Sequence, residues 1–560
     1  MSPRTPAWQS WSDELLERVP VERRPVLLVL VSDAAPHDGG LGARVFDDDA
    51  VLDALEHDVI PVRAESHEEP QLAARYHRGG WPTMVLLDGH GEVLEGGTWV
   101  DAPELLAMIA RARDVLGALP RLPARGDKQR EQVLHARLPL EIEAALLSDF
   151  DERHGGFGTG QKFPHPEALD YALLRHAEAR NPRLLEILEK TLTHMAEGGL
   201  HDRVEGGFFR TCEARDWRRP HTEKLLETNA GLTRNYLEAG QLLDRADFLE
   251  VGRRTAEHLL EAYDDTGTGL LHSALDPDDE YYAADSAARL TRRPPARSGR
   301  FLADANARAI SALLKAGAVL ERPEFTSAAV RIAENLVRKL VRSGRGVDHV
   351  LDRQGRTLPG GLRDEAETAR ALLLVLQSTD DRRFLPTLEE LIERLATREV
   401  ESLELSSGER STRILEEAVV AEVLLRAAIL LDRPSLEEVG RRLLEQHADE
   451  CRRGGWAMAA YGRSLELVLH PPLHVVIVGA ADDDRTSTLL AAAVSSPVPS
   501  RLVQRLDPVS DRDRLLALEL PEREGPVAWI LHRRRPLGEY AAPRVLQQGL
   551  WTGHGERLRS

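Results

Sequence analysis

The 560-residue chain is poor in cysteine. Only Cys212 and Cys451 are present, far apart in the sequence, so neither a disulfide framework nor a multi-cysteine metal site can form. The chain also lacks an apolar run of about 18 residues, which disfavours a transmembrane helix. Its first residues lack the apolar segment that a signal peptide carries. These absences predict a cytoplasmic protein without a membrane partner.

Basic residues are in deficit. Lys and Arg number 73 against 92 Asp and Glu, and the formal net charge of −19 argues against a nucleic-acid partner, which requires a basic face. Lysine is especially rare, with six in the whole chain, and Lys162 and Lys224 fall within glycine-rich loops. Because an ammonium is not interchangeable with a guanidinium, both are candidates for binding a substrate carboxylate or hydroxyl. Chance placement is the alternative.

Motifs for metals, nucleotides and activated serines are missing as well. The sequence contains no His-Glu-x-x-His, Cys-x-x-Cys, Gly-x-Ser-x-Gly or Walker pattern. The segment Gly479-Ala480-Ala481-Asp482-Asp483 follows an apolar run but departs from Gly-x-Gly-x-x-Gly, and its acidic residues stand where a phosphate would bind. The sequence therefore predicts neither a metal nor a cofactor.

Residues 1–118 alternate strand and helix patterns in the order βαβαββα, which is typical of a thioredoxin-like α/β domain. The strand expected over residues 25–31 runs into the loop where such a domain carries Cys-x-x-Cys. Trp81-Pro82-Thr83 precedes an apolar strand, at the place where this fold often has a cis-proline. Thiol exchange requires a thiolate, and this loop has none. The sequence thus predicts a thioredoxin-like fold that lacks the cysteines needed for redox chemistry.

The remaining chain divides into three parts. Residues 119–137 are rich in Pro, Arg and Gly and are typical of a linker. From 138 to 470, roughly twelve amphipathic helices pair as hairpins, one of them over 221–243. Six stacked hairpins can close into an all-α (α/α)6 toroid, with an open solenoid as the alternative. Residues 471–560 predict a small C-terminal α/β segment.

The richest polar segment lies between two predicted helices of the toroid. Asp216 and Glu223 can form a carboxylate pair, His221 can act as acid or base near neutral pH, and Trp217 can stack on a sugar ring. A purely structural interpretation is also available. Thr222 is a good N-cap residue, and a glutamate in the first turn complements the helix dipole, so the segment can be a helix start and nothing more.

Several motifs carry a resemblance to a known family: Gly79-Gly80-Trp81-Pro82, the loop over 155–166, Gly198 to Asp202 with His221 to Lys224, and Leu473 to Gly479. On these residues the chain resembles the thioredoxin-domain proteins related to spermatogenesis-associated protein 20. The resemblance covers nearly the whole chain. It implies a thioredoxin-like domain joined to a toroid similar to N-acylglucosamine 2-epimerases and six-hairpin glycosidases.

The chain departs from the family at the redox positions, which fall on Ala35 and Asp38, so both cysteines are lost. The polar residues that match the family are kept mainly in the toroid. They are Lys162, Arg210, Asp216, Trp217, His221, Glu223, Lys224, Asn229, Asn306 and Asp364.

Taken together, the residues and the resemblance predict a redox-inactive, degenerate binding or scaffold protein with a toroid cavity suited to a carbohydrate-like ligand. The alternative is a sugar-active enzyme of epimerase, isomerase or glycoside hydrolase type, with Asp216, His221 and Glu223 as catalytic residues and the other retained residues binding substrate. A redox role would rest on Cys212 alone. A protein partner is expected, if anywhere, at the thioredoxin-like domain.

Overall fold

The computed structural model describes residues 6–12, 14–31, 45–65, 72, 76, 82–89, 91, 93–98, 100–118, 134, 137–158, 160–398 and 407–559. Contacts between residues divide the chain into two units. The first comprises residues 1–131 and 399–415, and the second comprises residues 132–398 and 416–560. Ala35, Asp38, Trp81 and most of the predicted linker lie outside the described residues.

The first unit contains a four-stranded sheet in the order β2-β1-β3-β4. Its strands are β1 (Val26–Val31), β2 (Ile60–Glu65), β3 (Thr83–Leu87) and β4 (Val93–Thr98). β1 runs parallel to β2 and antiparallel to β3. Successive side chains of a strand point to opposite faces of the sheet, so the continuous apolar run of β1 contributes to a hydrophobic core on each face. One core lies against α3 (Asp49–His57) and α5 (Ala102–Ala118), and the other lies against α1 (Glu14–Glu22).

Among the described residues, twelve helices of the second unit alternate between an outer and an inner ring. The inner helices are α7 (Pro166–Ala179), α9 (Leu226–Leu242), α13 (Ala303–Val319), α15 (Leu362–Thr379), α17 (Ser407–Leu430) and α20 (Ala459–Leu469). The outer helices are α6 (Leu138–Asp149), α8 (Pro182–Glu197), α10 (Ala246–Tyr263), α14 (Pro323–Leu340), α16 (Leu385–Thr397) and α18 (Ser435–Glu445).

The helical ring is closed, as the contact between its first and last inner helices, α7 and α20, demonstrates. The prediction of a toroid rather than an open solenoid is therefore confirmed. Inner helices are buried on nearly every side, and α13 achieves this with alanines such as Ala305, Ala309 and Ala312, whose small side chains allow close approach. Within the described part of the chain, no helix combines the length and the apolar character needed to cross a membrane.

The helix predicted over 221–243 begins later, at Leu226. Upstream of it, β6 (Pro220–His221) pairs with β5 (Thr211–Cys212), and β7 (Lys224–Leu225) pairs with β8 (Ala274–Leu275). The backbone groups of these residues are satisfied by neighbouring loops instead of by a first helical turn. Consequently Thr222 is not an N-cap residue: its hydroxyl donates to Asp279 Oδ1 at 2.7 Å. The structural interpretation of this segment as a helix start is wrong.

The C-terminal segment also forms a four-stranded sheet, in the order β14-β13-β15-β16. Its strands are β13 (Leu473–Val478), β14 (Arg501–Leu506), β15 (Val527–His532) and β16 (Arg535–Tyr540). Here β13 runs parallel to β14 and antiparallel to β15, as β1 does to β2 and β3. Strand order and directions are thus the same in the two sheets.

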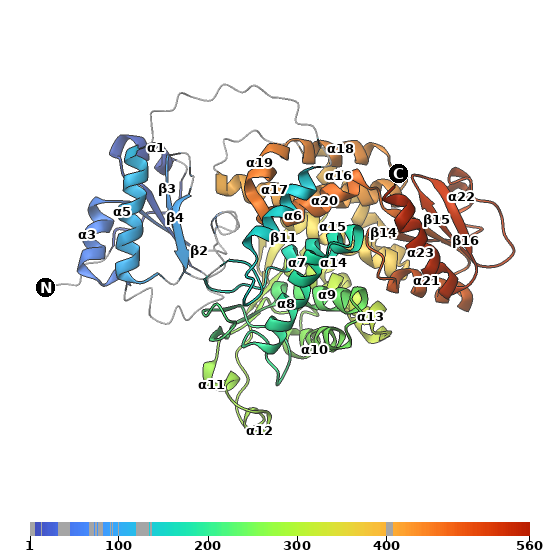
Figure 1. The fold of residues 1–560 in the computed structure, drawn as a ribbon, viewed down its shortest axis with the longest axis horizontal. Coiled ribbons are helices and arrows are strands. Elements are labelled where there is room, and N and C mark those ends of the chain that lie inside the picture. The colour runs from blue at the N-terminus through green and yellow to red at the C-terminus, as the bar shows by residue number, and fades with distance from the viewer. Residues whose placement is uncertain are drawn as a thin grey trace. The chain divides into compact units, whose positions relative to one another are not determined.

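The helices of the two sheets also correspond. α21 (Asp484–Ser495) and α23 (Pro543–Arg557) lie side by side on one face of the C-terminal sheet, as α3 and α5 do on the N-terminal one (Figure 1). The opposite face packs against α22 (Arg512–Ala517). A proline directly precedes the third strand in each case, Pro82 before β3 and Pro526 before β15. The described elements of both segments therefore share one strand order, with a helix after the first strand and another after the fourth, once before and once after the helical ring in the sequence.

Candidate functional site

Two glycine turns at the N-terminal side of the inner helices have the same sequence pattern, Asp-x-x-x-Gly-Gly-Phe. They span residues 151–157 and 202–208. In each turn the backbone carbonyl of the aspartate accepts from the N–H of the first glycine. The backbone N–H of the aspartate donates to the carbonyl of the second glycine. The glycines have φ between 70° and 83°, a region that disfavours residues with a Cβ. The pattern thus defines a repeated structural turn.

Each of these turns binds one of the rare lysines. Lys162 Nζ lies 2.8 Å from Asp151 Oδ2 and 2.9 Å from the Gly158 carbonyl oxygen. Lys224 Nζ lies 2.8 Å from both Asp202 Oδ2 and the Gly206 carbonyl oxygen. Burial lowers the pKa of both lysines, that of Lys224 to about 8. The ammonium groups that the sequence marked as substrate-binding candidates are therefore paired with the turns of the ring itself.

Asn229 and Asn306 occupy the fourth position of α9 and α13 and make equivalent contacts. The Asn229 amide accepts from the Phe208 N–H at 2.6 Å and donates to the Phe208 carbonyl at 3.0 Å. The Asn306 amide does the same with the backbone of Leu271, at 2.8 and 3.0 Å. Both side chains therefore tie a turn to the start of the next inner helix.

The proposed acid–base residues lie on the same side of the ring, close together in sequence. Arg210 and Glu223 form a buried ion pair with 2.5 Å between the guanidinium and the carboxylate. Burial raises the pKa of Glu223, and burial together with Arg210 lowers the pKa of His221 to about 4, so His221 is neutral at pH 7. Asp216 instead pairs with Arg218 on its own loop. The structure brings Arg210 and Glu223 together and pairs Asp216 elsewhere.

Trp217 is 1% exposed and belongs to the core. Its indole donates to the His154 carbonyl at 2.8 Å. A Cβ added at Gly156 or Gly198 would come within 2.7 Å of this residue, so both glycines make room for it. In this arrangement the indole ring of Trp217 packs against other protein atoms and does not face a cavity.

Two groups of described residues bring three possible metal ligands within 4.8 Å of one another: Asp304, His349 and Asp364, and Glu178, Glu466 and His470. Arginines already neutralise both groups. Arg363 lies 2.8 Å from Asp304, Arg557 lies 2.5 Å from Glu178, and Arg175 lies 2.7 Å from Glu466. These donor sets match salt-bridge clusters better than a cation site.

His349 is the titratable group of the first cluster, and its Nδ1 lies 2.9 Å from Asp364 Oδ1. Burial disfavours the imidazolium, but Asp364 and Asp304 outweigh burial and raise its pKa from 6.5 to about 9. A group whose pKa is higher in the folded than in the unfolded state contributes its full stabilisation at any pH below its unfolded-state pKa. That contribution is lost as the pH rises through its folded-state pKa. A protonated imidazole also cannot bind a metal ion.

We therefore expect the free energy of unfolding to fall by up to about 3 kcal/mol between pH 6.5 and 9 on account of His349. His349→Gln should flatten this part of the profile. Guanidinium denaturation at pH 6, 7.5 and 9 measures it, with the exposed His57→Gln as the control that should keep the wild-type slope. Equal slopes for wild type and His349→Gln would contradict the assignment.

The axis of the ring contains two adjoining cavities, one of about 200 Å³ and one of about 50 Å³. The larger cavity is lined by residues of all six inner helices and of the C-terminal segment. The two cavities share a layer of charged side chains. These are Asp170, Arg234, Arg370, Glu422 and Arg463. The residues singled out from the sequence line neither cavity.

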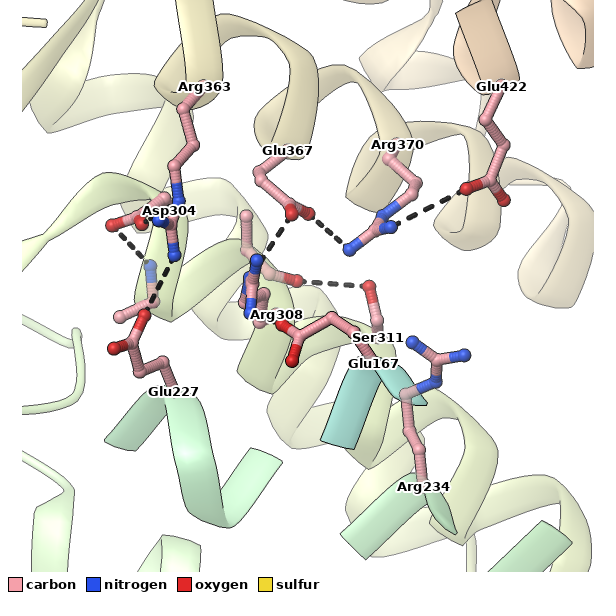
Figure 2. A network of polar contacts seen from close by, with 12 residues as sticks. Glu167, Glu227, Arg234, Asp304, Arg308, Ser311, Arg363, Glu367, Arg370 and Glu422 are labelled. Atoms are coloured by element: carbon pink, nitrogen blue, oxygen red, sulfur yellow. Dashed lines mark hydrogen bonds and ion pairs between the residues drawn. The ribbon is translucent and has the colours of Figure 1, made fainter. Parts of the chain in front are cut away.

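The charged layer is a network of ion pairs between inner helices (Figure 2). Arg308 of α13 lies 2.7 Å from Glu167 of α7 and 3.1 Å from Glu367 of α15. Glu367 also pairs with Arg370, which faces Glu422 of α17. Burial opposes ionisation of Glu422, but Arg463, Arg426 and Arg370 outweigh it and hold the pKa of Glu422 well below its usual range. Every carboxylate in this network therefore faces a guanidinium.

Sequence reasoning missed this network because its charges stand in helices that look amphipathic. The available signal was the presence of opposite charges one turn apart, such as Glu422 and Arg426, within otherwise apolar inner helices. On an outer helix the same spacing is an ordinary surface pair. Only closure of the ring turns these side chains toward a common axis.

The chain is similar in sequence to an uncharacterized protein of Caenorhabditis elegans, with 26% identity over 42% of this chain and 37% of that protein. It is also similar to human spermatogenesis-associated protein 20, with 24% identity over 48% of this chain and 39% of that protein. The matches thus span less than half the length of these relatives. No family model matches. These relatives confirm the resemblance predicted from the sequence, over less than half of this chain rather than nearly all of it.

Solved structures with similar chain traces include an epimerase, an isomerase and a glycoside hydrolase. Cellobiose 2-epimerase from Spirochaeta thermophila aligns with 60% of this chain and 96% of its own at 15% identity and a TM-score of 0.47. D-mannose isomerase aligns with 62% of this chain and 99% of its own, at 11% identity and a TM-score of 0.45. A family 76 glycoside hydrolase from Bacteroides thetaiotaomicron aligns with 69% of this chain and 83% of its own, at 9% identity and a TM-score of 0.45. Scores below 0.5 decide nothing about the chemistry of this chain.

Proposed function

We propose that this chain is a small-molecule-binding protein whose axial cavity holds a carbohydrate-like ligand, and that its N-terminal thioredoxin-like unit carries out no thiol chemistry. The observation that supports this most is the lining of the axis, where guanidinium and carboxylate side chains of different inner helices pair with one another. Each hydroxyl of a sugar both donates and accepts hydrogen bonds, so it requires both kinds of partner within reach.

The size of the cavity restricts the ligand. A volume of about 200 Å³ is below the ~300–1,000 Å³ common for ligand pockets, which favours a single sugar unit over an oligosaccharide. Apolar side chains such as Leu173, Leu314 and Leu373 complete the lining and can contact the carbon face of such a ring. Ion pairs hold the polar groups in place before the ligand arrives, which reduces the entropy lost on binding.

Binding without catalysis is favoured by the protonation states of two axial carboxylates. Burial raises the pKa of Glu167, but Arg308 outweighs burial and holds it at about 2, and the pKa of Glu422 is likewise held well below its usual range. Such carboxylates carry no proton to donate at neutral pH. Among the described residues that line the two cavities, none is a histidine. The catalytic alternative therefore depends on Asp216, His221 and Glu223, outside these cavities.

The redox-inactive part of the proposal has two supports. The strand order β2-β1-β3-β4 with its parallel β1–β2 pair is that of a thioredoxin-like frame, while residues 32–44 contain no cysteine. The two cysteines of the chain are both buried. Burial, and then Asp216 and Glu213, raise the pKa of Cys212 to about 12, so its thiolate is scarce at neutral pH.

The test is ligand-induced stabilisation of the full chain by a panel of monosaccharides, sugar acids and sugar phosphates. A binder present at 100 times its Kd should raise the free energy of unfolding by about 2.7 kcal/mol. Ala318→Phe places a large side chain in the cavity without changing its charge and should abolish the effect, while Ala318→Ser should retain it. Absence of any binder contradicts the proposal. Turnover of a sugar that is lost in His221→Gln would favour the enzyme instead.

A further inference from the structure

The two axial cavities differ in charge. Four basic side chains (Arg234, Arg308, Arg370 and Arg463) and four acidic ones (Glu167, Asp170, Glu367 and Glu422) line the smaller cavity, which is therefore balanced. Six basic side chains line the larger cavity: Arg234, Lys315, Arg370, Arg426, Arg463 and Arg501. Only three acidic ones accompany them, Asp170, Glu238 and Glu422. The larger cavity thus has a formal excess of three positive charges.

The excess arises at the end of the cavity that the C-terminal sheet closes. Arg501 of β14 donates to the backbone carbonyls of Ala493, Val494 and Val498, at 2.8, 2.5 and 2.5 Å. These bonds hold the guanidinium rigidly and leave its charge uncancelled by a carboxylate hydrogen bond. Arg426 shares Glu422 with Arg463, so one carboxylate serves both.

The C-terminal sheet is anchored where it closes the ring. The Val503 N–H donates to Gln377 Oε1 at 3.2 Å, and Gln504 Nε2 donates to the Leu430 carbonyl at 2.9 Å. Arg505 Nε lies 2.8 Å from Asp380 Oδ2. These contacts join strand β14 to the C-terminal ends of α15 and α17. Ring and sheet therefore form the cavity together, and the position of Arg501 is defined from both sides.

We propose that the larger cavity recognises its ligand through a phosphate or carboxylate group, bound between Arg426, Arg501 and Lys315. This inference rests on the proposed function, because it specifies the class of ligand for the same cavity. Guanidinium groups present pairs of donors that match the oxygens of either anion, and charge-assisted bonds of this kind are the stronger ones. Burial lowers the pKa of Lys315, of Arg426 and of Arg501, the last to about 10, so the charge of an entering anion would offset the cost of burying these cations.

The first test compares three probes by calorimetry at equal ionic strength: inorganic phosphate, glucose 6-phosphate and glucose. We expect glucose 6-phosphate to bind at least tenfold more tightly than glucose, with inorganic phosphate competing against it. Equal binding of glucose and its phosphate would overturn the charge inference while leaving the proposed function intact. If no member of the wider sugar panel binds, the proposed function fails.

Two substitutions with opposite expected effects on affinity distinguish a change in ligand binding from a folding defect. Arg426→Gln should weaken glucose 6-phosphate binding about tenfold. Glu238→Gln removes one of the three acidic side chains and should tighten binding severalfold, which a misfolded variant cannot do. Arg433→Gln, just beyond α17 and outside both cavities, is the matched control and should bind like wild type. Unchanged affinity in both cavity variants would overturn the proposal.

Discussion

Asp202→Asn is expected to destabilise the second unit by about 3–5 kcal/mol, the loss typical of breaking one side of a buried ion pair. Asp202 Oδ2 lies 2.8 Å from both Lys224 Nζ and Arg289 Nη1. The three side chains are 2%, 0% and 4% exposed, so water cannot replace the carboxylate. The asparagine would leave two buried cations facing one another without a compensating charge, and the Gly206 carbonyl would still accept from the Lys224 ammonium.

A matched control for this variant exists in the next repeat of the ring. Asp265 begins a turn with the same backbone bonds, to Leu270 and Gly269, but its side chain is 31% exposed and caps the N–H of Thr268. Asp265→Asn should therefore destabilise by less than about 1 kcal/mol. Chemical denaturation of both variants at pH 7 measures the difference. A loss for Asp202→Asn no greater than that for Asp265→Asn would refute the role of the buried pair.

Glu422→Gln should have an effect of similar size, also about 3–5 kcal/mol. Glu422 lies 2.7 Å from Arg463, 2.9 Å from Arg426 and 3.6 Å from Arg370, at the centre of the axial network. Its side chain is 5% exposed, and the glutamine would raise an existing excess of positive charge along the larger cavity. The three guanidinium groups would then repel one another in a region that water screens poorly.

The control is Glu437→Gln on outer helix α18, where the carboxylate pairs with Arg441 at 4.0 Å and is 57% exposed. Surface pairs of this kind contribute little, so we expect a change below about 0.5 kcal/mol. Denaturant midpoints at constant ionic strength compare the two variants. A stability for Glu422→Gln within 1 kcal/mol of wild type would mean that the network is not a connected unit.

Much of the architecture could be predicted from local patterns. The apolar run at 26–31 predicts a buried strand, and the Arg180-Asn181-Pro182 turn predicts the start of α8, where Asn181 caps the N–H of Arg183. Such signals depend only on neighbours in sequence. The start of α9 could not be predicted in this way, because residues 220–225 pair with strands β5 and β8 contributed by other loops.

The candidate site was harder to predict than the fold. The rarity of lysine drew attention to Lys162 and Lys224, but rarity cannot distinguish a ligand-binding ammonium from one that neutralises a buried aspartate. The same difficulty applies to Trp217, whose burial depends on two glycines at 156 and 198. Both outcomes are set by long-range packing, which leaves no local signature in the sequence.

By itself the sequence determined the paired helical hairpins, the two α/β segments and the absence of cysteine from residues 32–44, because each follows from periodicity or composition. Only the tertiary structure decided which charges meet. Arg463, Glu422 and Asp170 come from three helices, and ring closure through α7 and α20 brings them to one axis. The placement of Arg501 at the end of that axis likewise required the docking of a second sheet of the same topology. Electrostatic contacts between distant segments depend on folded distance, which sequence separation does not encode.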